Sequence, residues 1–175
     1  MNIFVNEYKR YNDLLEKTVR QISDDDFFRI VANNSNSIAI IIKHLSGNLL
    51  SRFTDFLTSD GEKEWRNRDA EFEGDNISRP RLMDMWRQAW QVLEKAVFDL
   101  SDPDMKKTVT IRGVEFTVAE ALARSLAHFS YHTGQIVFMG KIFQGKNWQY
   151  LSIAPGQSKA YNNNPIREKG FREDI

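Results

Sequence analysis

The chain has 175 residues, and its 24 basic and 24 acidic side chains give a formal net charge of zero. Without a basic excess there is no reason to expect a nucleic-acid partner. Without cysteine there can be no disulfide, thiolate metal site or cysteine nucleophile. The longest purely apolar run, residues 38–42, is too short for a membrane span, and the N-terminus lacks the pattern of a signal peptide. We expect one cytoplasmic domain over residues 1–175.

Apolar residues recur at helical spacing in four long segments. These predicted helices cover about 3–22, 37–57, 79–100 and 118–143. Asn36 or Ser37 suits the N-cap of the second helix, Pro80 the first turn of the third, and Gly145 the end of the fourth. The pattern predicts an all-α fold, a four-helix bundle with a crossover between the second and third helices.

The connections differ in character. Residues 58–78 carry turn residues and charges without a clear period, which predicts a long connection anchored by Trp65 and Phe72. Residues 108–118 alternate between apolar and polar around an Arg-Gly pair, which predicts a short β-hairpin before the last helix. From about 145 the chain is polar, and we expect an irregular C-terminal tail.

All three histidines of the chain fall within predicted helices. His128 and His132 are four residues apart, so their rings share one helix face and can reach one metal ion. With His44 from the second helix they would form an open facial site for Zn²⁺, Ni²⁺, Fe²⁺ or Mn²⁺. The alternative is three ordinary core or surface histidines. Burying three unpartnered polar rings is costly, and this favours the metal site.

The zinc motif of metalloproteases has the same histidine spacing, but a glutamate follows its first histidine. Phe129 stands at that position here. The general base of such proteases is therefore missing, and the protease hypothesis is rejected.

Polar residues near the histidines are candidates for substrate binding. Asn48 and Arg52 follow His44 at i+4 and i+8, so they continue its helix face. We interpret Asn48 as a polar pocket residue and Arg52 as a clamp for a carboxylate. The alternative is a solvated helix surface.

The connection around Trp65, Arg66 and Arg68 is a candidate to cover the metal and bind an anionic substrate. The alternative is a solvated loop that Trp65 anchors. Asp69 or Glu71 is a candidate to complete the coordination when no substrate is bound.

Three further residues of the last helix carry expectations. Ser130 and Tyr131 flank the histidines but are expected to face away from their line. Gly134 is expected to permit a close contact between helices, because a glycine inside a helix otherwise costs about 1 kcal/mol.

Two segments resemble a known family. Residues 41–48 (Ile-Ile-Lys-His-Leu-Ser-Gly-Asn) and 128–136 (His-Phe-Ser-Tyr-His-Thr-Gly-Gln-Ile), with the order of elements, resemble the DinB/YfiT-like metal-binding superfamily. The resemblance extends to about residue 145, and residues 52–72 resemble a bacterial branch of unassigned function. It implies an up-down-down-up bundle, a homodimer, and a metal ion held by one histidine from the second helix and two from the fourth, which here are His44, His128 and His132.

Characterised members of that superfamily include transferases and isomerases that use low-molecular-weight thiols such as bacillithiol, mycothiol or glutathione. The resemblance therefore implies a metal-dependent thiol S-transferase, or a related hydrolase, acting on a small electrophilic substrate. The thiol would have to be external, because the chain has no cysteine. The alternatives are a non-catalytic metal-binding or stress-response module and a helical interaction protein without metal. The sequence assigns no catalytic residue.

Overall fold

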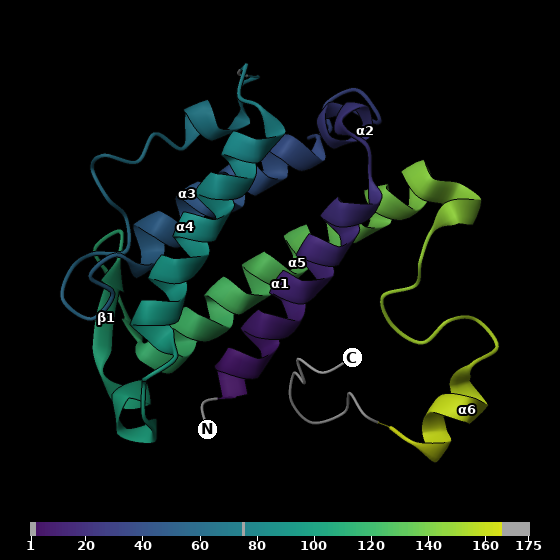
Figure 1. Ribbon diagram of the computed structural model, residues 1–175. Helices are drawn as coiled ribbons and strands as arrows, with labels where there is room; N and C mark the ends of the chain where they lie inside the picture. The colour runs from purple at the N-terminus through teal and green to yellow at the C-terminus, as the bar shows by residue number, and fades with distance from the viewer. Residues whose placement is uncertain (1–2, 75, 166–175) are drawn as a thin grey trace.

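A computed structural model describes residues 3–74 and 76–165. Its four long helices are α1 (Ile3–Gln21), α3 (Ile38–Phe53), α4 (Arg79–Val97) and α5 (Val118–Gln144). In Figure 1, α1 and α5 ascend while α3 and α4 descend, which is the up-down-down-up order. Helix α3 packs chiefly on α4, and α1 on α5. The predicted all-α bundle is confirmed.

Shorter elements connect or follow these helices. They are α2 (Asp24–Phe28), η1 (Asp69–Phe72), η2 (Asp102–Lys106), η3 (Gly145–Asn147) and α6 (Ser158–Asn163). The predicted long connection over residues 58–78 therefore contains a helical turn, η1, and the C-terminal tail, predicted to be irregular, contains α6. Helix α6 has no buried residue and lies apart from the bundle in Figure 1.

Local sequence signals define where the two helices that carry the histidines begin. The Ser37 side chain accepts a hydrogen bond from the Ile40 backbone N–H at 3.2 Å, and so caps α3. Thr117 and Glu120 form a capping box at the start of α5. These caps fix the turn at which each of the two helices starts.

Aromatic side chains fill the centre of the bundle. Phe129 is fully buried, with its ring centroid 6.2 Å from that of Tyr8 and 5.6 Å from that of Trp86. Burying side chains of this size contributes much of the hydrophobic stabilisation of a domain. The position that holds glutamate in zinc proteases is thus a core position here.

A glycine does permit close packing of α1 against α5, but it is Gly140. A Cβ at Gly140 would lie 2.5 Å from Thr18 Cγ2 and 3.2 Å from Trp148 Cζ3. A Cβ at Gly134 would meet no atom within 4 Å among the described residues, and Gly134 is exposed. The expectation for Gly134 is therefore wrong. Both glycines lie in α5, but among the described residues only a Cβ at Gly140 would meet a side chain of α1.

The predicted hairpin is present and is joined to the segment that follows α3. Its strands are β1 (Thr108–Ile111) and β2 (Val114–Thr117), paired antiparallel. Arg112 and Gly113 both have positive φ, as a two-residue hairpin turn requires. Their N–H groups donate to the Asp60 carboxylate at 2.8 Å, and Gly61 N–H donates to Thr110 O at 2.8 Å. These bonds hold the end of α3 beside the start of α5.

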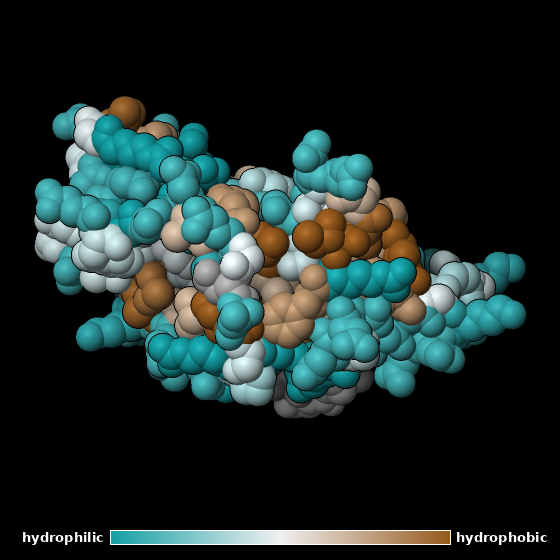
Figure 2. All heavy atoms as spheres, turned by 90° about the horizontal axis from the view of Figure 1, so that it is seen from above, coloured by the Kyte–Doolittle hydropathy of each residue, from teal (hydrophilic) through white to brown (hydrophobic). Residues whose placement is uncertain are grey.

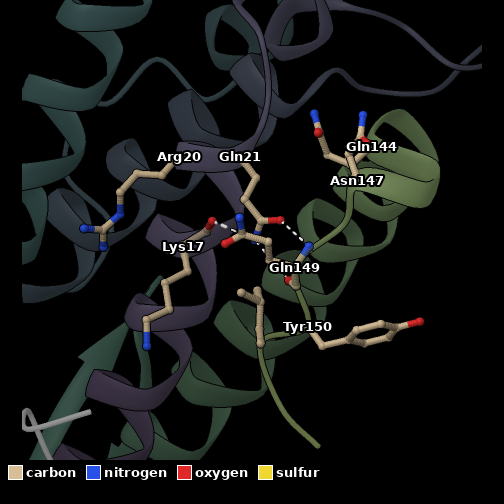
Figure 3. Close-up of a pocket in the computed structure, with 8 residues that line it drawn as sticks. Lys17, Arg20, Gln21, Gln144, Asn147, Gln149 and Tyr150 are labelled. Carbon is tan, nitrogen blue, oxygen red and sulfur yellow. Dashed lines mark hydrogen bonds between the residues drawn. The ribbon is translucent and has the colours of Figure 1, made fainter. Parts of the chain in front are cut away.

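The C-terminal segment returns to α1. Gln149 N–H donates to Gln21 Oε1 at 2.8 Å, and Gln21 Nε2 donates to Gln149 O at 3.2 Å (Figure 3). A polar hollow of about 520 Å³ lies here, lined by residues such as Lys17, Arg20 and Tyr150. None of the three histidines lines this hollow.

Hydrophobic side chains interrupt the polar surface in the view of Figure 2. Exposed apolar residues at the end of α2 and just after it are Phe28, Ile30 and Val31.

In the described ranges, no helix has the length and hydrophobicity that crossing a bilayer demands.

Candidate metal centre

The fold brings the three histidines together. His44 comes from α3, and His128 and His132 come from successive turns of α5. His44 Nε2 lies 3.1 Å from His128 Nε2, and one ring nitrogen from each histidine lies within 4.8 Å of the others. A metal bound at about 2.0–2.1 Å by each nitrogen needs spacings of this order. The predicted cluster of His44, His128 and His132 is therefore present, with a geometry that could hold a metal ion.

Burial keeps two of these rings neutral. His44 is 3% exposed, His132 is 7% exposed, and His128 is half-buried. Burial, followed by the neighbouring charge of His132, lowers the pKa of His128 to about 3. Burial also lowers the pKa of His132 to about 4, although a hydrogen bond with Gln135 opposes it. At neutral pH both rings hold the lone pair that a metal ligand needs.

Two of the rings are oriented through their outer nitrogens. His44 Nδ1 lies 2.8 Å from Glu71 Oε2, and His132 Nδ1 lies 2.7 Å from Gln135 Oε1. Both oxygens are acceptors, which assigns the ring proton to Nδ1 and leaves Nε2 unprotonated. A carboxylate or amide behind a histidine is the arrangement that orients histidine ligands in metalloproteins.

Glu71 is itself held by a buried arginine. Arg66 Nε donates to Glu71 Oε1 at 2.8 Å and its Nη2 donates to Oε2 at 3.0 Å, and the Arg66 side chain is 3% exposed. Burial raises the pKa of Glu71, but the hydrogen bonds from His44 and Arg66 outweigh this and place its pKa below the ordinary value. Glu71 is therefore a carboxylate that supports His44 from behind. The group of described residues that could hold a metal contains the three histidines without Glu71 or Asp69, so the expectation that one of these acids completes the coordination is not met.

Gly47 makes the contact between Glu71 and His44 possible. A Cβ at Gly47 would lie 2.8 Å from Glu71 Cδ and closer still to Glu71 Oε1. Any side chain at Gly47 would thus displace the carboxylate. The sequence offered a signal for this role, a glycine inside a helix one turn after His44, but it did not identify the partner.

The predicted substrate-binding residues differ in burial and in the contacts that they make. Asn48 is buried and Arg52 is half-buried, both on α3 beyond His44. Arg66 is engaged by Glu71, whereas Trp65 is 59% exposed. Their roles in binding a substrate stay predictions.

Arg68 contributes indirectly. Its guanidinium lies 5.1 Å from the centroid of the Phe72 ring, and that ring lies 4.7 Å from the His44 ring. Arg68 therefore covers the aromatic side chain that packs on His44, and its role toward a substrate also stays a prediction.

Tyr131 contacts the histidines, contrary to expectation. Its ring centroid lies 4.2 Å from that of His132 and 5.3 Å from that of His128, and the residue is 54% exposed. Ser130 instead donates to the Ala127 carbonyl at 2.9 Å. Tyr131 follows His128 at i+3, a spacing that places side chains together on a helix and could have indicated the contact.

Residues 1–157 match the profile of a family described as "Protein of unknown function (DUF1572)". The chain belongs to the DUF1572 family. No curated protein and no solved structure matches it. The match includes the whole bundle and all three histidines of this DUF1572 protein, but the family description assigns no activity. Its function must therefore be argued from the site.

Proposed function

We propose that this DUF1572 protein binds one divalent transition-metal ion through His44, His128 and His132 and acts as a metal-dependent enzyme on a small molecule. The observation that supports this most is the convergence of three histidine nitrogens within 4.8 Å. Three protein ligands leave coordination positions for water or substrate, as in catalytic zinc sites. His128 is the half-buried histidine of the three, so a substrate would enter the site from its side.

The reaction that we propose is conjugation of an external low-molecular-weight thiol to a small electrophile. A bound metal ion would lower the pKa of a coordinated thiol and hold it as a thiolate. The chain's own residues keep the site ready for this: Glu71 and Gln135 orient two rings, and burial keeps His128 and His132 neutral. The resemblance to the DinB/YfiT-like superfamily supports the thiol, a homodimer and a cytoplasmic location, all of which are part of the proposal.

A second candidate is a non-catalytic metal-binding or stress-response module. The observation that favours it is that Glu71, the carboxylate hydrogen-bonded to His44, has no free oxygen. Both of its oxygens are engaged by His44 and Arg66, so it is not free to act as a general base. Thiol transfer is less affected, because a metal-held thiolate needs no base at the moment of attack. A hydrolase, which must deprotonate water, is disfavoured for the same reason.

The test is a conjugation assay with metal-loaded protein. Purified chain is loaded with Zn²⁺, Ni²⁺, Fe²⁺ or Mn²⁺ and mixed with 1-chloro-2,4-dinitrobenzene and either bacillithiol or glutathione. We expect metal-dependent product formation that is lost in His128→Ala and His132→Ala. Ser130→Ala, on the same helix between the two histidines, is the matched control and should keep activity. Metal-loaded protein that turns over neither thiol would refute the transferase and leave the metal-binding module.

A further inference from the structure

Two arginines lie on the same side of the histidines. Arg52 follows His44 by eight residues on α3, and Arg124 precedes His128 by four on α5. Helices α3 and α5 run in opposite directions, so moving forward from His44 and backward from His128 leads to the same end of the bundle (Figure 1). That is the end at which the β-hairpin lies. Arg52 was among the residues predicted from the sequence, whereas Arg124, which is one helical turn from His128, was not.

Positive charge exceeds negative charge around Arg52. The charges of Arg66, Arg112 and Arg124 all act on it, and Glu62 is the acid that opposes them. Glu62 is shared, because its Oε2 also lies 3.1 Å from Arg112 Nε and 3.7 Å from Arg66 Nη1. The charge of Arg52 also acts on His128, which places this cation within electrostatic reach of the histidines.

Arg52 is packed in place without a partner for one of its nitrogens. Its Nη1 is buried and has no hydrogen-bond partner among residues 3–74 and 76–165. The side chain lies so close to Gly61 that a Cβ there would be 2.9 Å from Nη1 and 3.0 Å from Cδ. A buried, unpaired guanidinium nitrogen is costly, and a carboxylate is the planar group that pairs with a guanidinium through two hydrogen bonds.

We propose that Arg52 and Arg124 form a subsite for the carboxylate of the molecule that coordinates the metal. The inference rests on the proposed function, since it assumes a metal on the three histidines. Eight residues of α-helix span about 12 Å, and helical side chains lean toward the N-terminus, so Arg52 reaches back toward His44. The subsite therefore selects a short ligand that has a metal-binding atom at one end and a carboxylate at the other.

The test compares a carboxylate probe with its uncharged methyl ester. Protein loaded with Co²⁺, whose visible absorption reports ligand exchange, is titrated with 3-mercaptopropionate and with its methyl ester. We expect the acid to bind at least about tenfold more tightly than the ester, the size of one charge-assisted hydrogen bond. Arg52→Met and Arg124→Met should each reduce this preference while the affinity for the ester stays unchanged. Arg87→Met, which removes an exposed arginine on α4, is the matched control and should retain it.

The outcomes separate the two proposals. If the protein binds no Co²⁺, the proposed function is refuted, whatever the two arginines bind. Bound Co²⁺ with equal affinity for acid and ester would overturn the subsite alone. A preference that survives in both variants would also overturn it, since the metal would then account for the preference. Arg124 is exposed, so its variant serves as the test if Arg52→Met fails to fold.

Discussion

Gly47→Ala tests whether Glu71 positions His44. In an ordinary helix interior this substitution stabilises, because alanine is favoured over glycine by about 1 kcal/mol. At position 47 the new methyl group would lie 2.8 Å from Glu71 Cδ and nearer still to its Oε1. Helix backbone cannot give way here without loss of its own hydrogen bonds. The carboxylate must therefore leave its place between His44 and Arg66.

The magnitude follows from the bonds that would be lost. Each hydrogen bond to a charged group contributes about 1.5–3 kcal/mol, and Arg66 would remain buried without its partner. Losing one such bond already outweighs the gain in helix propensity. We expect a net destabilisation of about 1–2 kcal/mol, or about 2–8 °C in Tm for a chain of this length. Metal affinity should fall about 10- to 100-fold, as it does when the partner of a histidine ligand is removed.

Thermal unfolding with and without metal, together with metal titration, measures both effects. Gly134→Ala is the matched control, because it lies in a helix where a Cβ meets nothing within 4 Å among the described residues. It should stabilise the protein by up to about 1 kcal/mol and leave metal affinity unchanged. If Gly47→Ala behaves like Gly134→Ala in both measurements, Glu71 does not position His44.

Three further changes have defined outcomes. Glu71→Gln keeps the shape of the side chain but removes its charge, and should weaken metal binding about tenfold or more in a chelator competition; unchanged affinity would contradict the role of Glu71. The pKa values of His128 and His132, about 3 and 4, lie below the value near 6.5 in the unfolded chain. As the pH falls through 6.5 the unfolded chain therefore takes up protons first, and the metal-free protein loses stability relative to its stability above about pH 7. Between pH 7 and 5 we expect urea unfolding to show a loss of about 2 kcal/mol after discounting for partial exposure, and a pH-independent value would count against buried neutral rings. Gly140→Ala should lower the unfolding free energy by about 1–3 kcal/mol because its methyl group meets Thr18, and unchanged stability would show that α1 shifts freely.

The sequence predicts the parts of the site that depend on helical periodicity. His128 and His132 share a face because four residues make one helical turn, and that holds whatever else the chain does. His44 is 84 residues from His128, so the residues alone show only that it lies in another helix. The up-down-down-up order, which the resemblance implied, brings α3 beside α5 so that His44 lies next to His128 and His132.

The supporting residues could not be predicted in this way. Glu71 lies 27 residues beyond His44 in a connection without periodicity, and its approach depends on the path of that connection. Gly47 and Gly140 differ from Gly134 only in what lies opposite them, which no local pattern reports. Side-chain direction caused the error at Tyr131, whose ring turns toward His132 although the two residues are adjacent in the helix.

Metal content is the most direct test of the central claim. The protein is purified, equilibrated with Zn²⁺ or Ni²⁺, freed of excess ion and measured by elemental analysis beside His44→Ala, His128→Ala and His132→Ala. The site predicts about one equivalent per chain, bound with a rise in melting temperature, and its loss in each variant. Wild-type protein that holds less than about 0.1 equivalent after loading, with no change in melting temperature, would contradict the metal site.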